Sequence, residues 1–119
     1  LVLADGKLRE LHKHLHRDCH LGFVTVADEV GHKVYKRSAC MMLVKAVYDV
    51  AGKENVDQVT LHFSIGSGYY FTIKGRVRLD EEFVQQVKIR MRELVDARIP
   101  FHKRNVRTDE AVEIFAGRR

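Results

Sequence analysis

A strand–turn–strand pattern between residues 58 and 74 restricts the possible folds most strongly. Apolar side chains occupy every second position of its first half: Val59, Leu61, Phe63 and Ile65. This period of two is typical of a half-buried strand. Gly66-Ser67-Gly68 then favours a turn, and a second strand is expected over Tyr69 to Lys74. The sequence therefore predicts an antiparallel hairpin, whose apolar face needs helices to cover it.

Two helices are predicted on either side of this hairpin. The first begins with Ser38 as N-cap and ends before Gly52, and its apolar face comprises Met42, Leu43, Ala46, Val47 and Val50. The second begins after Asp80 and ends before Pro100, with an apolar stripe of Phe83, Val84, Val87, Met91, Leu94 and Val95. Both sets are spaced by three and four residues, which is the helical period.

After the second helix, Phe101 to Val106 predicts a strand and Thr108 is the expected cap of a short final helix. Ala111, Val112 and Phe115 would face inward from it. The predicted order of elements is helix, strand, strand, helix, strand, helix. This order indicates an α+β fold with two layers, in which helices pack on one face of an antiparallel sheet.

The first 36 residues predict a small β-rich unit that precedes this domain. Its expected strands are residues 1–3, 7–11, 20–26 and 33–35, with a turn from Asp28 to Gly31. We therefore expect one domain boundary, between residues 1–36 and 37–119.

Cys19 and Cys40 have no disulfide-framework spacing, which favours a reducing, cytoplasmic location. No apolar run approaches the roughly 20 residues of a membrane helix.

The formal net charge of +5 raises the question of a phosphate-bearing partner. Basic residues form three clusters in the second domain: Lys74, Arg76 and Arg78, then Lys88, Arg90 and Arg92, then Lys103, Arg104 and Arg107. The candidate phosphate or nucleic-acid contacts among them are Lys74, Arg76, Arg78, Lys103 and Arg104. The alternative is a set of solvated surfaces that happen to be basic. The sequence favours this alternative, because aromatic residues are not interleaved with the basic clusters as stacking platforms would be.

Residues for catalysis or metal binding are sparse. His12, His14 and His16 would share one face of a strand, beside Cys19 and His20, but a polar strand edge explains them better than a metal site. Gly66-Ser67-Gly68 joins two strands, so it predicts a hairpin turn and not a dinucleotide-binding loop. No phosphate-binding Gly-x-x-x-x-Gly-Lys-Ser/Thr motif occurs. We therefore expect no catalytic residue and no bound metal or cofactor in this chain.

From Arg37 onward, four short motifs follow one another in a familiar order. They are Arg37-Ser38-Ala39-Cys40-Met41, Gly68-Tyr69-Tyr70-Phe71-Thr72-Ile73, Ile99-Pro100-Phe101 and Asp109-Glu110-Ala111 up to Phe115. This order resembles the second N-terminal domain of threonyl-tRNA synthetases, which the editing domains of alanyl-tRNA synthetases share. Residues 1–36 resemble the end of the ubiquitin-like TGS domain that precedes it.

The sequence differs from this family at the residues that form the family's metal-binding or hydrolytic pocket. Arg37 and Met41 replace the two histidines of His-Ser-x-x-His, Thr72 replaces a strand aspartate, and the later Cys-x-x-x-His segment is absent. The positions that correspond to the family's editing pocket are Arg37, Ser38, Met41, Tyr70 and Thr72. The resemblance therefore implies a degenerate pocket that does not hydrolyse aminoacyl-tRNA.

A TGS-like unit followed by a degenerate editing-like domain also resembles the N-terminal region of bacterial uridine-kinase-like proteins. This resemblance implies an accessory region without catalysis, whose partner is a downstream P-loop kinase domain that uses ATP and magnesium. A nucleotide, RNA or a second copy of the chain are further partners left open. One alternative is a piece of a threonyl-tRNA synthetase or a related editing protein. The other is an RNA-binding or dimerisation module.

Overall fold

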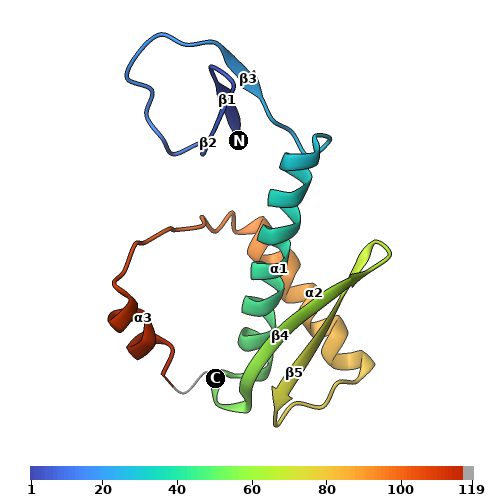
Figure 1. Cartoon of the computed structure of the whole chain (residues 1–119). Coiled ribbons are helices and arrows are strands. Elements are labelled where there is room, and N and C mark those ends of the chain that lie inside the picture. The colour runs from blue at the N-terminus through green and yellow to red at the C-terminus, as the bar shows by residue number, and fades with distance from the viewer. Residues whose placement is uncertain (117–119) are drawn as a thin grey trace. The chain divides into compact units, whose positions relative to one another are not determined.

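A computed structural model describes residues 1–116, which form two units with the division between Met41 and Met42 (Figure 1). The elements are antiparallel strands and helices, so the predicted α+β class is confirmed. None of the helices in the described residues is both long and apolar enough to cross a membrane.

The first unit begins with a three-stranded antiparallel sheet in the order β2-β1-β3. These strands are β1 (Val2–Ala4), β2 (Lys7–Arg9) and β3 (Leu21–Phe23). Asp5 and Gly6 form the tight turn between β1 and β2 with positive φ angles of 47° and 74°. Three of the four strands expected in residues 1–36 are present, each close to its expected position.

Helix α1 (Glu29–Ala51) corrects the sequence prediction between residues 28 and 38. The expected turn at Asp28–Gly31 and the expected strand at residues 33–35 are wrong, because both lie at the start of this helix. Ser38 is therefore an interior residue and not an N-cap. The helix runs without a break through the predicted domain boundary after residue 36, and that division stays a prediction.

Thr25 and Asp28 explain why α1 begins so early. The Asp28 carboxylate accepts hydrogen bonds from the Thr25 backbone N–H at 2.7 Å and from its hydroxyl at 3.1 Å. The backbone N–H of Thr25 is the main cause of a lowered Asp28 pKa. This Thr-x-x-Asp arrangement is half of a capping box. A side chain at Gly31 would place its Cβ only 1.8 Å from the Thr25 carbonyl oxygen, so glycine is needed there.

The second unit contains the predicted hairpin and the predicted helix after it. Strand β4 (Val56–Ile65) pairs with β5 (Gly68–Gly75), and Ile65 lies opposite Gly68 across the turn. Helix α2 (Glu81–Asp96) is capped by Asp80, whose Oδ1 accepts a hydrogen bond of 2.9 Å from the Phe83 N–H. The hairpin turn and the Asp80 cap are therefore confirmed.

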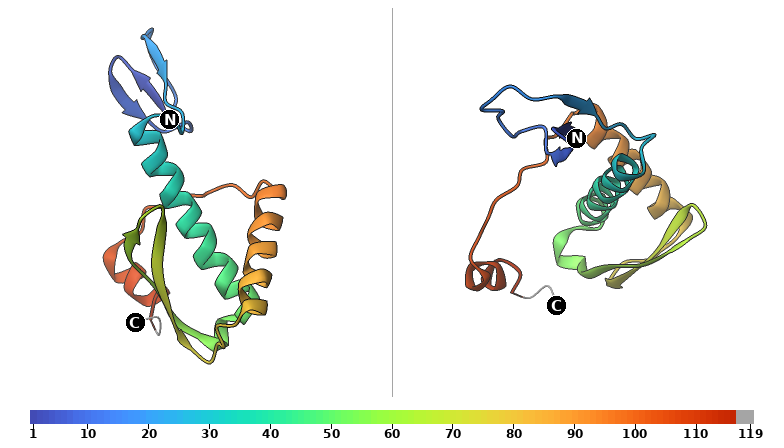
Figure 2. Two further views of the ribbon diagram at one scale, coloured as in Figure 1. Left: turned by 90° about the vertical axis from the view of Figure 1, so that its right-hand side faces the viewer. Right: turned by 45° about the horizontal axis from the view of Figure 1, so that its top comes forward.

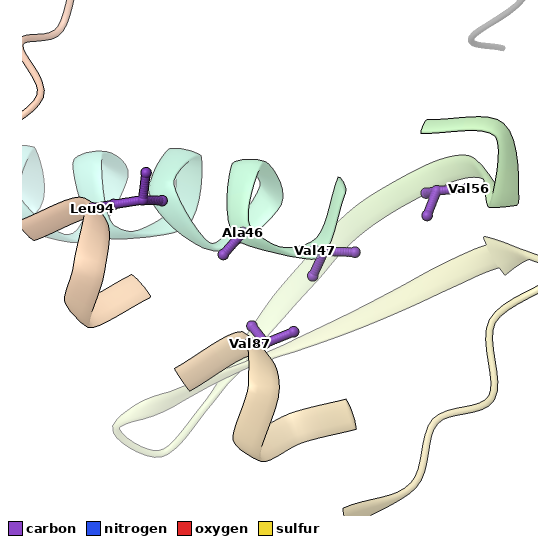
Figure 3. Packing of buried hydrophobic residues seen from close by; sticks show 5 residues of the cluster. All are labelled: Ala46, Val47, Val56, Val87 and Leu94. Atoms are coloured by element: carbon purple, nitrogen blue, oxygen red, sulfur yellow. The ribbon is translucent and has the colours of Figure 1, made fainter. Parts of the chain in front are cut away.

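A small apolar core joins the two helices to the hairpin. Figure 3 shows its buried side chains from α1, β4 and α2 in one cluster: Ala46, Val47, Val56, Val87 and Leu94. Val59 and Ile73 of the hairpin pack against this cluster.

An ion pair also links the two helices: Arg90 of α2 donates a 3.0 Å hydrogen bond to Asp49 of α1. Partial burial acts to raise the pKa of Asp49, but the bonds from Lys45 and Arg90 outweigh it and lower this pKa.

The C-terminal part differs from the prediction. Residues 97–107 contain no strand, so the expected strand Phe101–Val106 is wrong (Figure 2). Helix α3 (Thr108–Ile114) is present, but Arg107 occupies its N-cap position, with no side-chain capping bond. Val112 and Phe115 were expected to face inward and are 64% and 56% exposed. No sheet strand exists beside α3 in the described residues for them to pack on.

Candidate functional site

The hairpin has one face on the core and one face toward solvent. Val59 and Ile73 form a cross-strand pair that packs against the core. Because side chains alternate along a strand, the next pair, Thr60 and Thr72, lies on the opposite face. Lys74, two residues beyond Thr72, lies on that face too. We call this surface the solvent face of the hairpin.

A bulge in β4 enriches the solvent face in rings. Leu61 lies opposite Phe71, but Phe63 lies opposite Tyr70, so His62 is the extra residue in β4. A bulge turns side chains from their regular alternation. As a result His62 and Phe63 both contact Tyr70, with ring centroids 5.4 Å away in each case. The three rings therefore form one cluster on the solvent face.

The ring cluster is open to solvent and partly fixed by a hydrogen bond. Phe63 is 58% exposed and Tyr70 is 46% exposed. The His62 Nε2 atom lies 2.8 Å from the Thr72 hydroxyl oxygen, and either group can be the donor, depending on the histidine tautomer. The rings of His62 and Phe63 are tilted by 35° and 32° against Tyr70. Together they offer an aromatic surface to a planar ligand.

The predicted pocket positions divide between the two units. Arg37, Ser38 and Met41 lie on α1 in the first unit, where Arg37 and Met41 are exposed and Ser38 is half-buried. Tyr70 and Thr72 lie in the second unit, and both contact His62 there. The sequence pattern placed Phe63 on the same face as Val59 and did not single out His62. The bulge instead brings both side chains to Tyr70.

The predicted phosphate contacts differ in how far acidic groups already neutralise them. Arg78 lies 3.6 Å from Asp80, and Arg104 lies 3.4 Å from Glu110. Lys103 is also engaged with a neighbouring group. Lys74 and Arg76 form no ion pair with any residue in the range 1–116. Of the five predicted contacts, these two are the most available to a phosphate.

The histidine-rich segment does not form the strand that would align its side chains. His12, His14 and His16 lie in the connection between β2 and β3. Within residues 1–116, no group of three or more histidine, cysteine or acidic side chains is placed to hold a metal ion. The expectation that the chain binds no metal stays a prediction, which metal analysis of the purified protein would test.

Comparison with known proteins gives one consistent kind of relative. The chain is 31% identical over 115 residues to the threonine–tRNA ligase of Thermotoga neapolitana. This alignment covers 96% of the chain and 18% of the ligase. It is 30% identical to the Thermotoga maritima ligase and 25% identical to the Clostridium kluyveri ligase, each over 116 residues. The chain thus spans less than a fifth of these relatives. No family model and no solved structure matches it.

These relatives overturn the kinase interpretation. The resemblance to uridine-kinase-like proteins led us to expect an accessory region of a nucleoside kinase, with phosphate transfer from ATP by the parent protein. That interpretation is wrong, because the similarity covers nearly the whole chain and is to threonine–tRNA ligases. ATP, magnesium and a downstream P-loop domain were implied only by the kinase, and nothing tests them separately. The resemblance to threonyl-tRNA synthetases is supported.

Proposed function

We propose that this chain is an accessory region of a threonine–tRNA ligase-like protein, and that it contacts tRNA without hydrolysing the ester bond between the tRNA and its amino acid. The observation that carries the proposal is the exposed ring cluster of His62, Phe63 and Tyr70 on the solvent face of the hairpin. Similarity to threonine–tRNA ligases over 96% of the chain supports tRNA as the nucleic acid.

The chemistry of the solvent face suits unpaired nucleotides. Unstacked bases bind to exposed aromatic rings, and each base stacked in this way contributes about 1–3 kcal/mol. Lys74 lies on the same face and forms no ion pair within residues 1–116, so it is available to a backbone phosphate. A tRNA offers unpaired bases and phosphates together at its 3′ end and in its loops.

The same residues argue against hydrolysis. His62 and Thr72 form a contact that resembles a base and a nucleophile. Nucleophilic catalysis also needs a third group to orient the base, and donors to stabilise the oxyanion. In the described part of the chain no third group holds the other ring nitrogen of His62. The family's two helix histidines are Arg37 and Met41 here, so the metal-binding or hydrolytic alternative also lacks its ligands.

Incubation with serine-charged threonine tRNA tests this proposal. We expect the purified chain to bind the charged tRNA and to release serine no faster than buffer does. Binding is measured by fluorescence anisotropy and release by acid-gel analysis of the same samples, so a lack of turnover cannot be confused with a lack of binding. Turnover at saturating chain that exceeds the buffer rate about tenfold, a difference of about 1.4 kcal/mol in the barrier, would contradict the proposal.

A further inference from the structure

The first unit contains a hollow beneath the connection between β2 and β3. It has a volume of about 440 Å³ and is lined by residues from the β1–β2 turn, from β2 and from the connection itself. Its basic lining side chains are Lys7, Arg9, Lys13 and Arg17, and its only acidic one is Asp5. His14 and His16 add ring N–H groups to the same lining. The hollow therefore carries a clear excess of positive charge.

The four cations of the hollow are not neutralised by the protein. None of Lys7, Arg9, Lys13 and Arg17 forms an ion pair or a side-chain hydrogen bond with another residue of the described range 1–116. In the second unit, by contrast, Arg78, Arg90, Arg104 and Arg107 each lie beside a carboxylate. Unpaired cations that converge on one hollow raise the local concentration of anions.

Hydrogen bonds hold both ends of the connection that lines the hollow. The Asp5 Oδ1 atom accepts a 2.9 Å hydrogen bond from the His20 N–H, and the Asp5 N–H donates one of 2.9 Å to the His20 carbonyl oxygen. The first bond engages one oxygen of the only acidic side chain in the lining, and the two bonds together tie the end of the connection to the β1–β2 turn. At the other end, the Lys13 N–H donates a 3.0 Å bond to the Glu10 carbonyl oxygen. The cations thus project from a closed loop and not from a free chain.

We propose that this hollow is a binding site for clustered phosphate groups, such as those of a nucleoside triphosphate or of an RNA backbone. Its size accommodates several phosphates, and its cations come from two segments, Lys7 and Arg9 from β2 and Lys13 and Arg17 from the connection. Arginine forks bind phosphate oxygens in pairs, and lysines add point charges. The site is independent of the hairpin and of its proposed contact with tRNA.

Inorganic tripolyphosphate is the probe that tests this site, because it carries the phosphate chemistry without a base. By isothermal titration at low ionic strength, the unaltered chain is expected to bind tripolyphosphate. The double variant Lys13→Glu/Arg17→Glu is expected to bind it at least about tenfold more weakly, because two attractive charges become repulsive. A control, Lys33→Glu/Lys53→Glu, makes the same change in net charge at two residues that do not line the hollow, and should bind within about twofold of the unaltered chain.

Two results would overturn the proposal: no binding of tripolyphosphate to the unaltered chain, or an equal loss in both double variants, which would mean a diffuse charge effect. Circular dichroism monitors folding, and Lys13→Gln/Arg17→Gln, with an expected loss of about threefold, replaces the charge reversal if that variant unfolds. Competition then identifies the source of the phosphates. Displacement of tripolyphosphate by ATP alone indicates a free nucleotide, and displacement by a single-stranded RNA indicates a nucleic-acid backbone.

Discussion

Replacing Phe63 and Tyr70 together by alanine is expected to weaken binding of threonine tRNA about thirtyfold, a loss of about 2 kcal/mol. The two rings lie 5.4 Å apart on the solvent face of the hairpin, and neither belongs to the buried core. Their removal should therefore delete the stacking surface and leave the fold intact. Binding is measured by fluorescence anisotropy at a fixed salt concentration, because phosphate contacts make affinity salt-dependent.

A matched control separates stacking from general loss of aromatic surface. Phe101 and Phe115 are 62% and 56% exposed, and both lie outside the hairpin. The double variant Phe101→Ala/Phe115→Ala should bind tRNA within about twofold of the unaltered chain, because isolated exposed rings contribute little. An equal loss in the two double variants would show that the ring cluster on the hairpin has no special role.

The largest expected effect on stability comes from Leu94→Ala. Leu94 of α2 is 6% exposed and belongs to a core with few other buried side chains, so its loss leaves a cavity that nothing fills. We expect the free energy of unfolding to fall by about 3 kcal/mol, within the range for buried leucines. Leu79 is 58% exposed, and Leu79→Ala should cost less than about 1 kcal/mol. Urea unfolding measures both, and similar costs would mean that the core is not where the structure places it.

Local signals predicted the hairpin and α2 correctly. The alternation specified a strand with one buried face from Val59 to Leu61, but beyond the bulge Phe63 lies on the solvent face and not on the buried face that the alternation predicted. Asp80 caps α2 as its position suggested. The start of α1 was missed because the strand-like Lys33-Val34-Tyr35 was given more weight than Thr25-x-x-Asp28. That capping signal was present in the sequence and overrides the weak β preference of three residues.

The candidate site was only half predictable. Resemblance pointed to Tyr70 and Thr72, but the approach of His62 and Phe63 to Tyr70 depends on a bulge in β4 that leaves no mark in the alternation. The sequence analysis also concluded that aromatic and basic residues are not interleaved, whereas the regular alternation of β5 places Lys74 on the same face as Tyr70. The strand predicted at Phe101–Val106 has no partner strand within residues 1–116, and β-branched or aromatic composition alone does not make a strand.

The central claim is that the hairpin contacts tRNA, and an NMR titration of the labelled chain with uncharged threonine tRNA tests it most directly. We predict that the amide signals of β5 from Gly68 to Lys74, together with those of His62 and Phe63, shift or broaden first. Signals from the core-facing residues of α2, such as Val87 and Leu94, should change little. Binding of tRNA that leaves the hairpin signals unchanged, or no binding at low salt, would contradict the account.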